Sequence, residues 1–408
     1  MNDKAAGIER GHFAERGTPG EVFAAFLKLG LTSFGGPIAH LGYFRDELVQ
    51  RRRWIDDKGY ADLVALCQFL PGPASSQVGF AMGLLRGGPL GALAAFIAFT
   101  LPSALFLIAF AYGAAVFGGP IGSGIINGLK IVAVAIVAQA VWGMAKNLCP
   151  DRQRATIAVA AVLIVIGVAG AFGQVAAIIV GGLAGLWFCR NDSEAVSGHI
   201  TFPVSRRAGA IFLALFAVLL IGLPLAASAA GNQGLSVFDS FYRAGSLVFG
   251  GGHVVLPLLE SEVVRPGWVS HDQFLAGYGA AQAVPGPLFT FAAYLGTVLK
   301  PEPNGISGAI IALVAVFLPG FLLLIGSIPF WDVFRARPKA QAMMRGANAA
   351  VVGILGAALY DPVFTSAIVS PAAFALALVC FVLLMAWKTP PWIIVIVAAI
   401  GGVGISLF

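Results

Sequence analysis

One pattern of aromatic residues, glycines and prolines occurs twice in this chain. The stretch 23–36 reads Phe-Ala-Ala-Phe-Leu-Lys-Leu-Gly and then reaches Phe-Gly-Gly; the stretch 238–251 reads Phe-Asp-Ser-Phe-Tyr-Arg-Ala-Gly and reaches the same motif 215 residues later. A tryptophan, a Gln-x-x-Pro-Gly-Pro motif and a Leu-Pro pair follow each copy in the same order. Residues at equivalent places in the two copies are called repeat mates below. Two copies of a unit with glycine and proline breaks inside apolar segments are typical of membrane transporters.

The composition indicates that a lipid bilayer surrounds most of the chain. The sequence is 59% hydrophobic and 11% charged, and its mean hydropathy is +0.89. Apolar stretches near 20 residues indicate membrane spans. The clearest are 88–117, 121–145, 155–171, 172–189, 208–230, 306–331, 346–360, 363–387 and 390–408. We therefore predict an all-α polytopic membrane protein with about nine full transmembrane helices in addition to the broken segments.

Several other classes of protein do not fit the sequence. The positive charge is not gathered on a soluble face, which excludes nucleic-acid binding. The four cysteines are scattered without metal or redox spacing, so we expect no metal and no cofactor. Residues 1–20 are polar and lack the apolar core of a signal peptide, which predicts a cytoplasmic tail.

The loop charges predict that the two copies have inverted topology. Residues 43–58 carry three consecutive arginines, whereas the equivalent residues 258–273 carry Glu260, Glu262 and Asp272 with one arginine. Basic loops stay in the cytoplasm, so the two loops face opposite sides. We predict a first repeat at 21–190, a loop and connecting helix at 191–236, and a second, inverted repeat at 237–408. The amino terminus is then cytoplasmic and the carboxyl terminus periplasmic.

The same charge-based topology predicts how the broken segments enter the membrane. Segments 21–42 and 59–86, with their counterparts 237–258 and 271–299, are expected to dip into the membrane as re-entrant elements. If the first two segments each crossed the membrane fully, the rest of the chain would keep the same sidedness. The three arginines between them would then lie outside the cell.

The four breaks predict a binding site for a small tetrahedral anion. Helix amino termini present free N–H groups and about half a positive charge, and glycine lets an anion approach the backbone. The predicted substrate-binding residues are Lys28, Phe34, Gly35, Gly36, Gln68, Pro71, Gly72, Pro73, Ser75, Ser76, Arg243, Gly250, Gly251, Gly252, Gln282, Pro285, Gly286, Pro287 and Thr290. In the alternative interpretation the motifs are kinks or packing notches, which their recurrence in register disfavours.

Charged side chains near the breaks also occur as repeat mates. Lys28 and Arg243 each lie six residues before Phe-Gly-Gly, where a cation either attracts the anion or snorkels to the membrane surface. Glu47 and Glu262 are mates too, and are interpreted as a helix cap or loop salt bridge, or alternatively as proton-coupling groups. His40 and His253 are not mates.

The doubled motifs resemble the chromate ion transporter (CHR) family, in particular its long two-domain bacterial members, over about residues 21–408. The stretch from Lys28 to Pro37, the region of Trp54 and the Gln68 to Pro73 motif carry the resemblance with their second copies. The second copy departs from the first, because it has Arg243 in place of lysine and lacks the proline after its glycines, so the halves could contribute unequally. The resemblance implies a multi-pass protein of the bacterial inner membrane that expels chromate and confers resistance.

Other functions stay open at this point. Sulfate is the chemical analogue of chromate, so a transporter or channel for sulfate or another oxyanion is an alternative. A membrane-embedded enzyme is disfavoured, because the chain has no Cys-x-x-Cys, haem-attachment or dinucleotide motif, and it also lacks a P-loop for ATP. The pattern does not distinguish a monomer from a homodimer.

Overall fold

The computed structural model describes residues 17–116, 119–168, 170–190, 202, 204–249, 251–335 and 337–407. Throughout these residues the regular structure is helical, without any strand. Within this described part of the chain, six helices are long and apolar enough to cross a membrane. They are Ala74–Ala114, Gly119–Leu148, Ala171–Phe188, Arg206–Ala230, Gly305–Arg335 and Pro338–Ala367. The prediction of an all-α membrane protein is therefore confirmed.

The first copy begins with helices separated at the predicted breaks. The elements are α1 (Pro19–Thr32), α2 (Gly36–Phe44), the π-helix η1 (Arg45–Arg51), α3 (Asp57–Phe69) and α4 (Ala74–Val116). Side chains of Thr18 and Asp56 cap the starts of α1 and α3 by accepting backbone N–H groups. Helices α5 (Gly119–Leu148), α6 (Arg152–Gly167), α7 (Ala171–Phe188) and α8 (Arg206–Ala230) follow.

The second copy repeats this order. Its elements are α9 (Gln233–Ser246), η2 (Gly252–Val254), α10 (Val255–Val263), α11 (His271–Ala281), η3 (Leu288–Thr290), α12 (Phe291–Val298), α13 (Gly305–Ser327), η4 (Ile328–Phe330), α14 (Trp331–Arg335), α15 (Pro338–Ala358), η5 (Leu359–Phe364), α16 (Thr365–Ala367), α17 (Pro371–Met385) and α18 (Pro391–Leu407). Where α4 continues through a kink at Gly88, the second copy has the two separate helices α12 and α13.

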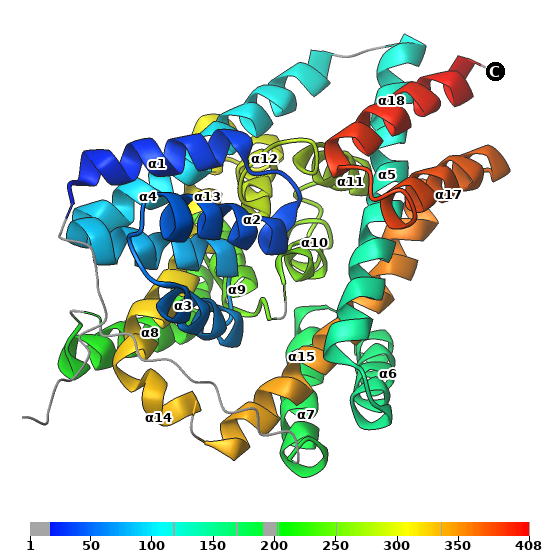
Figure 1. Ribbon diagram of the computed structural model, residues 1–408. Helices are drawn as coiled ribbons and strands as arrows, with labels where there is room; N and C mark the ends of the chain where they lie inside the picture. Colours follow the sequence, from blue (N-terminus) through cyan, green and yellow to red (C-terminus); the bar gives the residue numbers. More distant parts are fainter. Residues whose placement is uncertain are drawn as a thin grey trace, which may run out of the picture.

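The helices form two groups, and each group draws on both copies. Figure 1 shows α1–α4 beside α8, α9, α10, α12 and α13, whereas α5–α7 lie with α15, α17 and α18. We call α1–α4 with α8–α13 the break group, and α5–α7 with α15–α18 the span group. Helices α5 and α11 join the groups at a close backbone contact, where a Cβ atom on Gly279 would lie 2.2 Å from the Leu129 carbonyl oxygen. All four breaks belong to the break group.

Glycine is required at the breaks because the backbone there takes positive φ angles. Gly35 has φ 98°, Gly72 has φ 122° and Gly286 has φ 104°. Residues with a Cβ atom rarely adopt these values. The breaks are therefore sharp changes of chain direction between helices.

Candidate functional site

Two backbone hydrogen bonds join the breaks of one repeat to those of the other. The N–H group of Gly72 donates to the carbonyl of Val248 at 2.8 Å, and that of Gly286 donates to the carbonyl of Ser33 at 2.9 Å. Gly72 and Gly286 are repeat mates, and so are Ser33 and Val248, which directly precede the Phe-Gly-Gly motifs. We call this pair the break latch. Its reciprocity is the pattern of contacts across a two-fold axis.

The contact between Pro37 and Gly252 lies at the centre of this arrangement. These two residues are repeat mates, and a Cβ atom on Gly252 would lie 3.0 Å from Cγ of Pro37. Mates that touch each other lie on the axis relating the copies. Two prolines would crowd this point, which explains why the second copy has glycine where the first has proline.

A small cavity lies where the Phe-Gly-Gly break of the first copy meets the Pro-Gly-Pro break of the second. Gly35, Gly36, Gln282 and Gly286 line it, and its volume is about 20 Å³. That is room for about one water molecule. The Nε2 atom of Gln282 is buried without a hydrogen-bond partner in the described chain. An unsatisfied buried donor is costly, so this amide is available to a ligand at the cavity.

The start of α4 collects further unsatisfied polar groups close to the latch. Nδ1 of His40 lies 3.4 Å from Oγ of Ser75, and Ser33, whose carbonyl accepts the latch bond from Gly286, also interacts with His40 through its backbone. Within the described residues, His40 Nε2 and the hydroxyls of Ser33 and Ser76 have no hydrogen-bond partner. Sequence reasoning missed His40 and Ser33 as site residues. No sequence signal marked Ser33, because it contributes a backbone carbonyl, a group that every residue has.

Gln77 fixes the first Pro-Gly-Pro break to the second copy. Its Nε2 atom donates to the carbonyl of Pro71 at 3.1 Å and to that of Gly320 in α13 at 2.9 Å. Gly320 in turn packs against the break, because a Cβ atom there would lie 3.1 Å from Cδ of Pro73. The break is therefore held by contacts from both repeats.

The structure brings some of the predicted site residues together and leaves others apart. Gly35, Gly36, Gln282 and Gly286 share the cavity, and Gly72 belongs to the latch. The hydroxyl of Thr290 donates to the carbonyl of Pro287 at 2.7 Å within its own turn. Gln68 is exposed and does not line the cavity.

The remaining predicted residues have structural contacts or lie elsewhere. The ring of Phe34 lies 6.4 Å from that of Trp392, and Pro285 is buried beside the latch residue Gly286. Gly251 has φ 148° and leads into η2. Gly250 lies outside the described residues.

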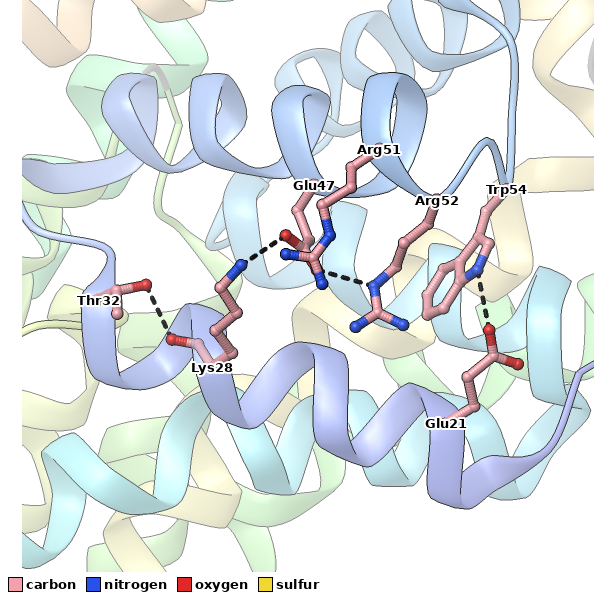
Figure 2. Close-up of polar contacts among 7 residues, drawn as sticks. All are labelled: Glu21, Lys28, Thr32, Glu47, Arg51, Arg52 and Trp54. Atoms are coloured by element: carbon pink, nitrogen blue, oxygen red, sulfur yellow. Dashed lines mark hydrogen bonds and ion pairs between the residues drawn. The ribbon is translucent and has the colours of Figure 1, made fainter.

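Lys28 is neutralised in an ion-pair cluster on the first copy (Figure 2). Its Nζ atom lies 2.8 Å from Oε2 of Glu47. The other carboxylate oxygen of Glu47, Oε1, lies 2.8 Å from Nε of Arg52 and 3.3 Å from Nη2 of Arg51. Burial alone would raise the pKa of Glu47, but hydrogen bonds from Lys28 and Arg52 hold it below the usual carboxyl range. The salt-bridge interpretation of Glu47 is confirmed.

Arg243 is neutralised by the repeat mate of Glu47. Its Nη2 atom lies 2.9 Å from Oε2 of Glu262 and 3.0 Å from Oδ2 of Asp239. Burial raises the pKa of Glu262, and its single cation only partly offsets this. The salt-bridge interpretation of Glu262 is therefore confirmed too, and neither Arg243 nor Lys28 lines the cavity.

One buried cation was missed in the sequence. Lys130 lies within α5 with an exposed fraction of 9%, and its Nζ atom is 2.6 Å from Oδ1 of Asp272 at the start of α11. A lone lysine inside the apolar stretch 121–145 was a usable signal, because charges inside spans are costly. The pair joins the break group to the span group.

Comparison with known proteins identifies the family of the chain. The model of the chromate transporter family matches residues 20–186 and 235–403, which covers both copies. The chain belongs to the chromate transporter family. The predicted resemblance is thus confirmed, and the doubled motifs are features of a chromate transporter family chain.

Members of the family from several organisms align over nearly the whole chain. A chromate transport protein of Pseudomonas aeruginosa is 31% identical over 95% of this chain and 92% of its own length. A probable chromate transport protein of Synechococcus elongatus is 28% identical over 93% of both chains. A chromate transport protein of Cupriavidus metallidurans is 27% identical over 97% of this chain and 96% of its own. No solved structure matches the chain.

Proposed function

We propose that this protein is a secondary transporter that exports chromate, a tetrahedral dianion, from the bacterial cytoplasm and so confers resistance to it. Membership of the chromate transporter family supports the substrate. The cavity shared by Gly35, Gly36, Gln282 and Gly286 is the observation that carries the proposed site, because both repeats contribute to it. Sulfate has the same shape and charge and is the alternative substrate.

The proposed topology places the two repeats in opposite orientations in the inner membrane. The opposite charges of loops 43–58 and 258–273 support it, and the reciprocal break latch is what a two-fold relation between the repeats requires. The amino terminus is then cytoplasmic and the carboxyl terminus periplasmic. The proposal keeps nine full spans, with repeats at 21–190 and 237–408 around the connecting segment 191–236.

Anion binding would compete with the break latch. The N–H groups of Gly72 and Gly286 are donors suited to an oxyanion, but both bind carbonyls of the other repeat in this structure. A cavity of about 20 Å³ holds one water, so a larger oxyanion requires the breaks to separate. Separation would release these two N–H groups, which could then bind the anion together with Gln282.

The packing favours movement of the break group against the span group over movement of one repeat against the other. The latch ties the broken halves of both copies into one unit, whereas α5 and α11 form the main contact with the span group. In this form of alternating access, the break group moves relative to the span group and carries the binding site from one side of the membrane to the other. Charged pairs such as Lys130 with Asp272 would stabilise one position of that movement.

The membrane potential alone can drive export. Moving one charge across 100 mV is worth about 2.3 kcal/mol, so a dianion leaving a negative interior gains roughly 4–5 kcal/mol per 100 mV. Export therefore needs no ATP, which agrees with the absence of a P-loop from the sequence.

Inside-out vesicles test the proposed function. Labelled chromate should enter them saturably when the vesicle interior is made positive, with sulfate as a competitor. Counterflow of unlabelled anion should accelerate exchange, which a channel does not do. Equal uptake with and without the protein at every potential would overturn the proposal.

A further inference from the structure

The two ion-pair clusters occupy equivalent places in the repeats but have opposite charge balance. In the first copy three cations surround one carboxylate, Glu47. In the second copy two carboxylates, Asp239 and Glu262, share one cation, Arg243. The repeat mate of Asp239 is Ala24, so the second carboxylate is an addition to the shared plan. In the first copy a single carboxylate, Glu47, joins the two helical arms that flank the Phe-Gly-Gly break. Joining the equivalent arms of the second copy therefore does not require Asp239.

The geometry makes full ionisation of the second cluster costly. Both carboxylates contact the same nitrogen, Nη2 of Arg243, at 3.0 and 2.9 Å, and the side chains of both are only 9% exposed. Two ionised carboxylates this close repel each other, and one cation neutralises only one of them. Binding a proton removes the surplus charge. The side chain of Arg243 is 31% exposed, which gives a proton a route to water.

Other charged groups near the cluster do not restore its balance. Helix α13, packed on α9, and α7, packed on α10, contain no charged residue. Arg206 and Arg207 lie at the far end of α8 from α9.

The charged groups near Glu262 on α10 have other partners. Glu260 interacts with Arg265, His271 and Asp361, and His253 of η2 forms a hydrogen bond with the hydroxyl of Tyr278. On α15, Arg345 donates to the carbonyl of Cys189 and to Gln341, and Lys339 lies at the helix start. The charged groups acting on Glu262 are Arg243 and Asp239.

We propose that Asp239 and Glu262 together bind one exchangeable proton, and that this proton enters the cell as the anion leaves. The proposal rests on the proposed export function and adds its coupling ion. In the proposed topology the cluster faces the periplasm, from which a proton would be taken up. Its counterpart around Glu47, surrounded by three cations, is not a proton site.

The cluster is placed where a proton can influence the site. Asp239 and Arg243 lie on α9 and Glu262 on α10, so the ion pairs bridge the arms on either side of the second Phe-Gly-Gly break. Between those arms lies Val248, whose carbonyl holds the break latch. Protonation weakens one ion pair to Arg243 and loosens this bridge. Release of the proton restores it.

Proteoliposomes containing the full-length protein and an internal pH dye test the proposal. A chromate or sulfate gradient is applied while the potential is clamped, and anion and proton fluxes are recorded together. The wild-type protein should move protons against the anion flow. Asp239→Asn should keep anion flux within about twofold and lose at least tenfold in protons moved per anion. Glu47→Gln, the matched change on the first copy, should leave that ratio unchanged.

The outcomes separate this proposal from the export function. Anion flux without proton flux in the wild-type protein, or an unchanged ratio in Asp239→Asn, would overturn the proton site and leave export standing. Absence of anion flux in the wild-type protein would instead contradict export. Should Asp239→Asn fold poorly, infrared titration of the wild-type protein and of Glu262→Gln provides a second test. At a pH above the range in which ordinary carboxyl groups titrate, the wild-type protein should show a stronger band of protonated carboxyl than Glu262→Gln; equal bands in the two proteins would contradict the proposal.

Discussion

The N–H group of Gly72 donates to the carbonyl of Val248 at 2.8 Å, so a break in the first repeat is held by the chain just before a break in the second. Its repeat counterpart, Gly286 to Ser33, is 2.9 Å long. Each bond joins one Pro-Gly-Pro break to the Phe-Gly-Gly break of the other repeat, and the contact between Pro37 and Gly252 links the two pairs. Under the proposed function, the N–H groups in these two bonds are the donors offered to an oxyanion, so anion binding would require the breaks to separate.

Replacing either latch glycine should destabilise the protein. Gly72→Ala puts a Cβ atom 3.0 Å from Nε2 of Gln77 and 3.1 Å from Cα of Gly320, at a φ of 122° that alanine rarely adopts. We expect a loss of about 1–3 kcal/mol and a lower melting temperature in detergent. Gly143→Ala, at a helical glycine with open space around it, should leave the melting temperature unchanged or raise it. Equal effects of the two changes would contradict the role of the break.

The contact between Pro37 and Gly252 predicts a rescue experiment. Gly252→Pro should destabilise the chain by about 1–3 kcal/mol, because the added ring meets Pro37. Adding Pro37→Gly should recover most of that loss, since the proline then lies on the other side of the axis. Melting temperatures of the single and double variants check this. A double variant no better than Gly252→Pro alone would show that the two residues do not oppose each other.

Removing the two mated cations should have unequal effects on stability. Lys28→Ala leaves Glu47 with Arg51 and Arg52, and the lysine side chain is 48% exposed, so we expect a loss below about 1 kcal/mol. Arg243→Ala strands two carboxylates that are each 9% exposed, and removing one partner of a buried pair costs about 3–5 kcal/mol. Thermal unfolding compares the variants directly. Transport unchanged by both would also exclude a role for these cations in attracting the anion.

The raised pKa of Glu262 predicts that its contribution to the stability of the fold falls as the pH rises. Burial favours its neutral form, so Glu262 takes up a proton at a higher pH than an ordinary carboxyl does. A raised folded-state pKa means that the contribution of this group to stability is present in acid and is lost as the pH rises past that pKa. Glu262→Gln keeps the neutral form at every pH. Its melting temperature should therefore depend less on pH than that of the wild-type protein in the range where carboxyl groups titrate, and a parallel dependence would contradict the assignment.

The repeat, the helical class and the positions of the breaks could be predicted from the sequence, because glycine and proline restrict the backbone locally. Sequence also identified Lys28 with Arg243 and Glu47 with Glu262 as mates, but spacing alone could not show that Lys28 binds Glu47 or that Arg243 binds Glu262. The latch acceptors were beyond prediction, since Ser33 and Val248 contribute carbonyls that every residue has. The division into break and span groups depends on packing between distant helices, which loop charges do not report.

The different positions of Gln68 and Gln282 also could not be predicted from the sequence. The two glutamines occupy identical motifs in sequence, yet Gln282 lines the cavity and Gln68 is exposed. Only the arrangement of the surrounding helices distinguishes them.

Anion binding to these two glutamine variants tests the central claim most directly. A hydrogen bond to a charged group is worth about 1.5–3 kcal/mol, so Gln282→Ala should weaken chromate or sulfate binding to the purified protein by roughly tenfold or more. Gln68→Ala should leave the dissociation constant within about twofold of the wild-type value. Equal effects of both changes, or a larger effect of Gln68→Ala, would contradict a site at the cavity where the two repeats meet.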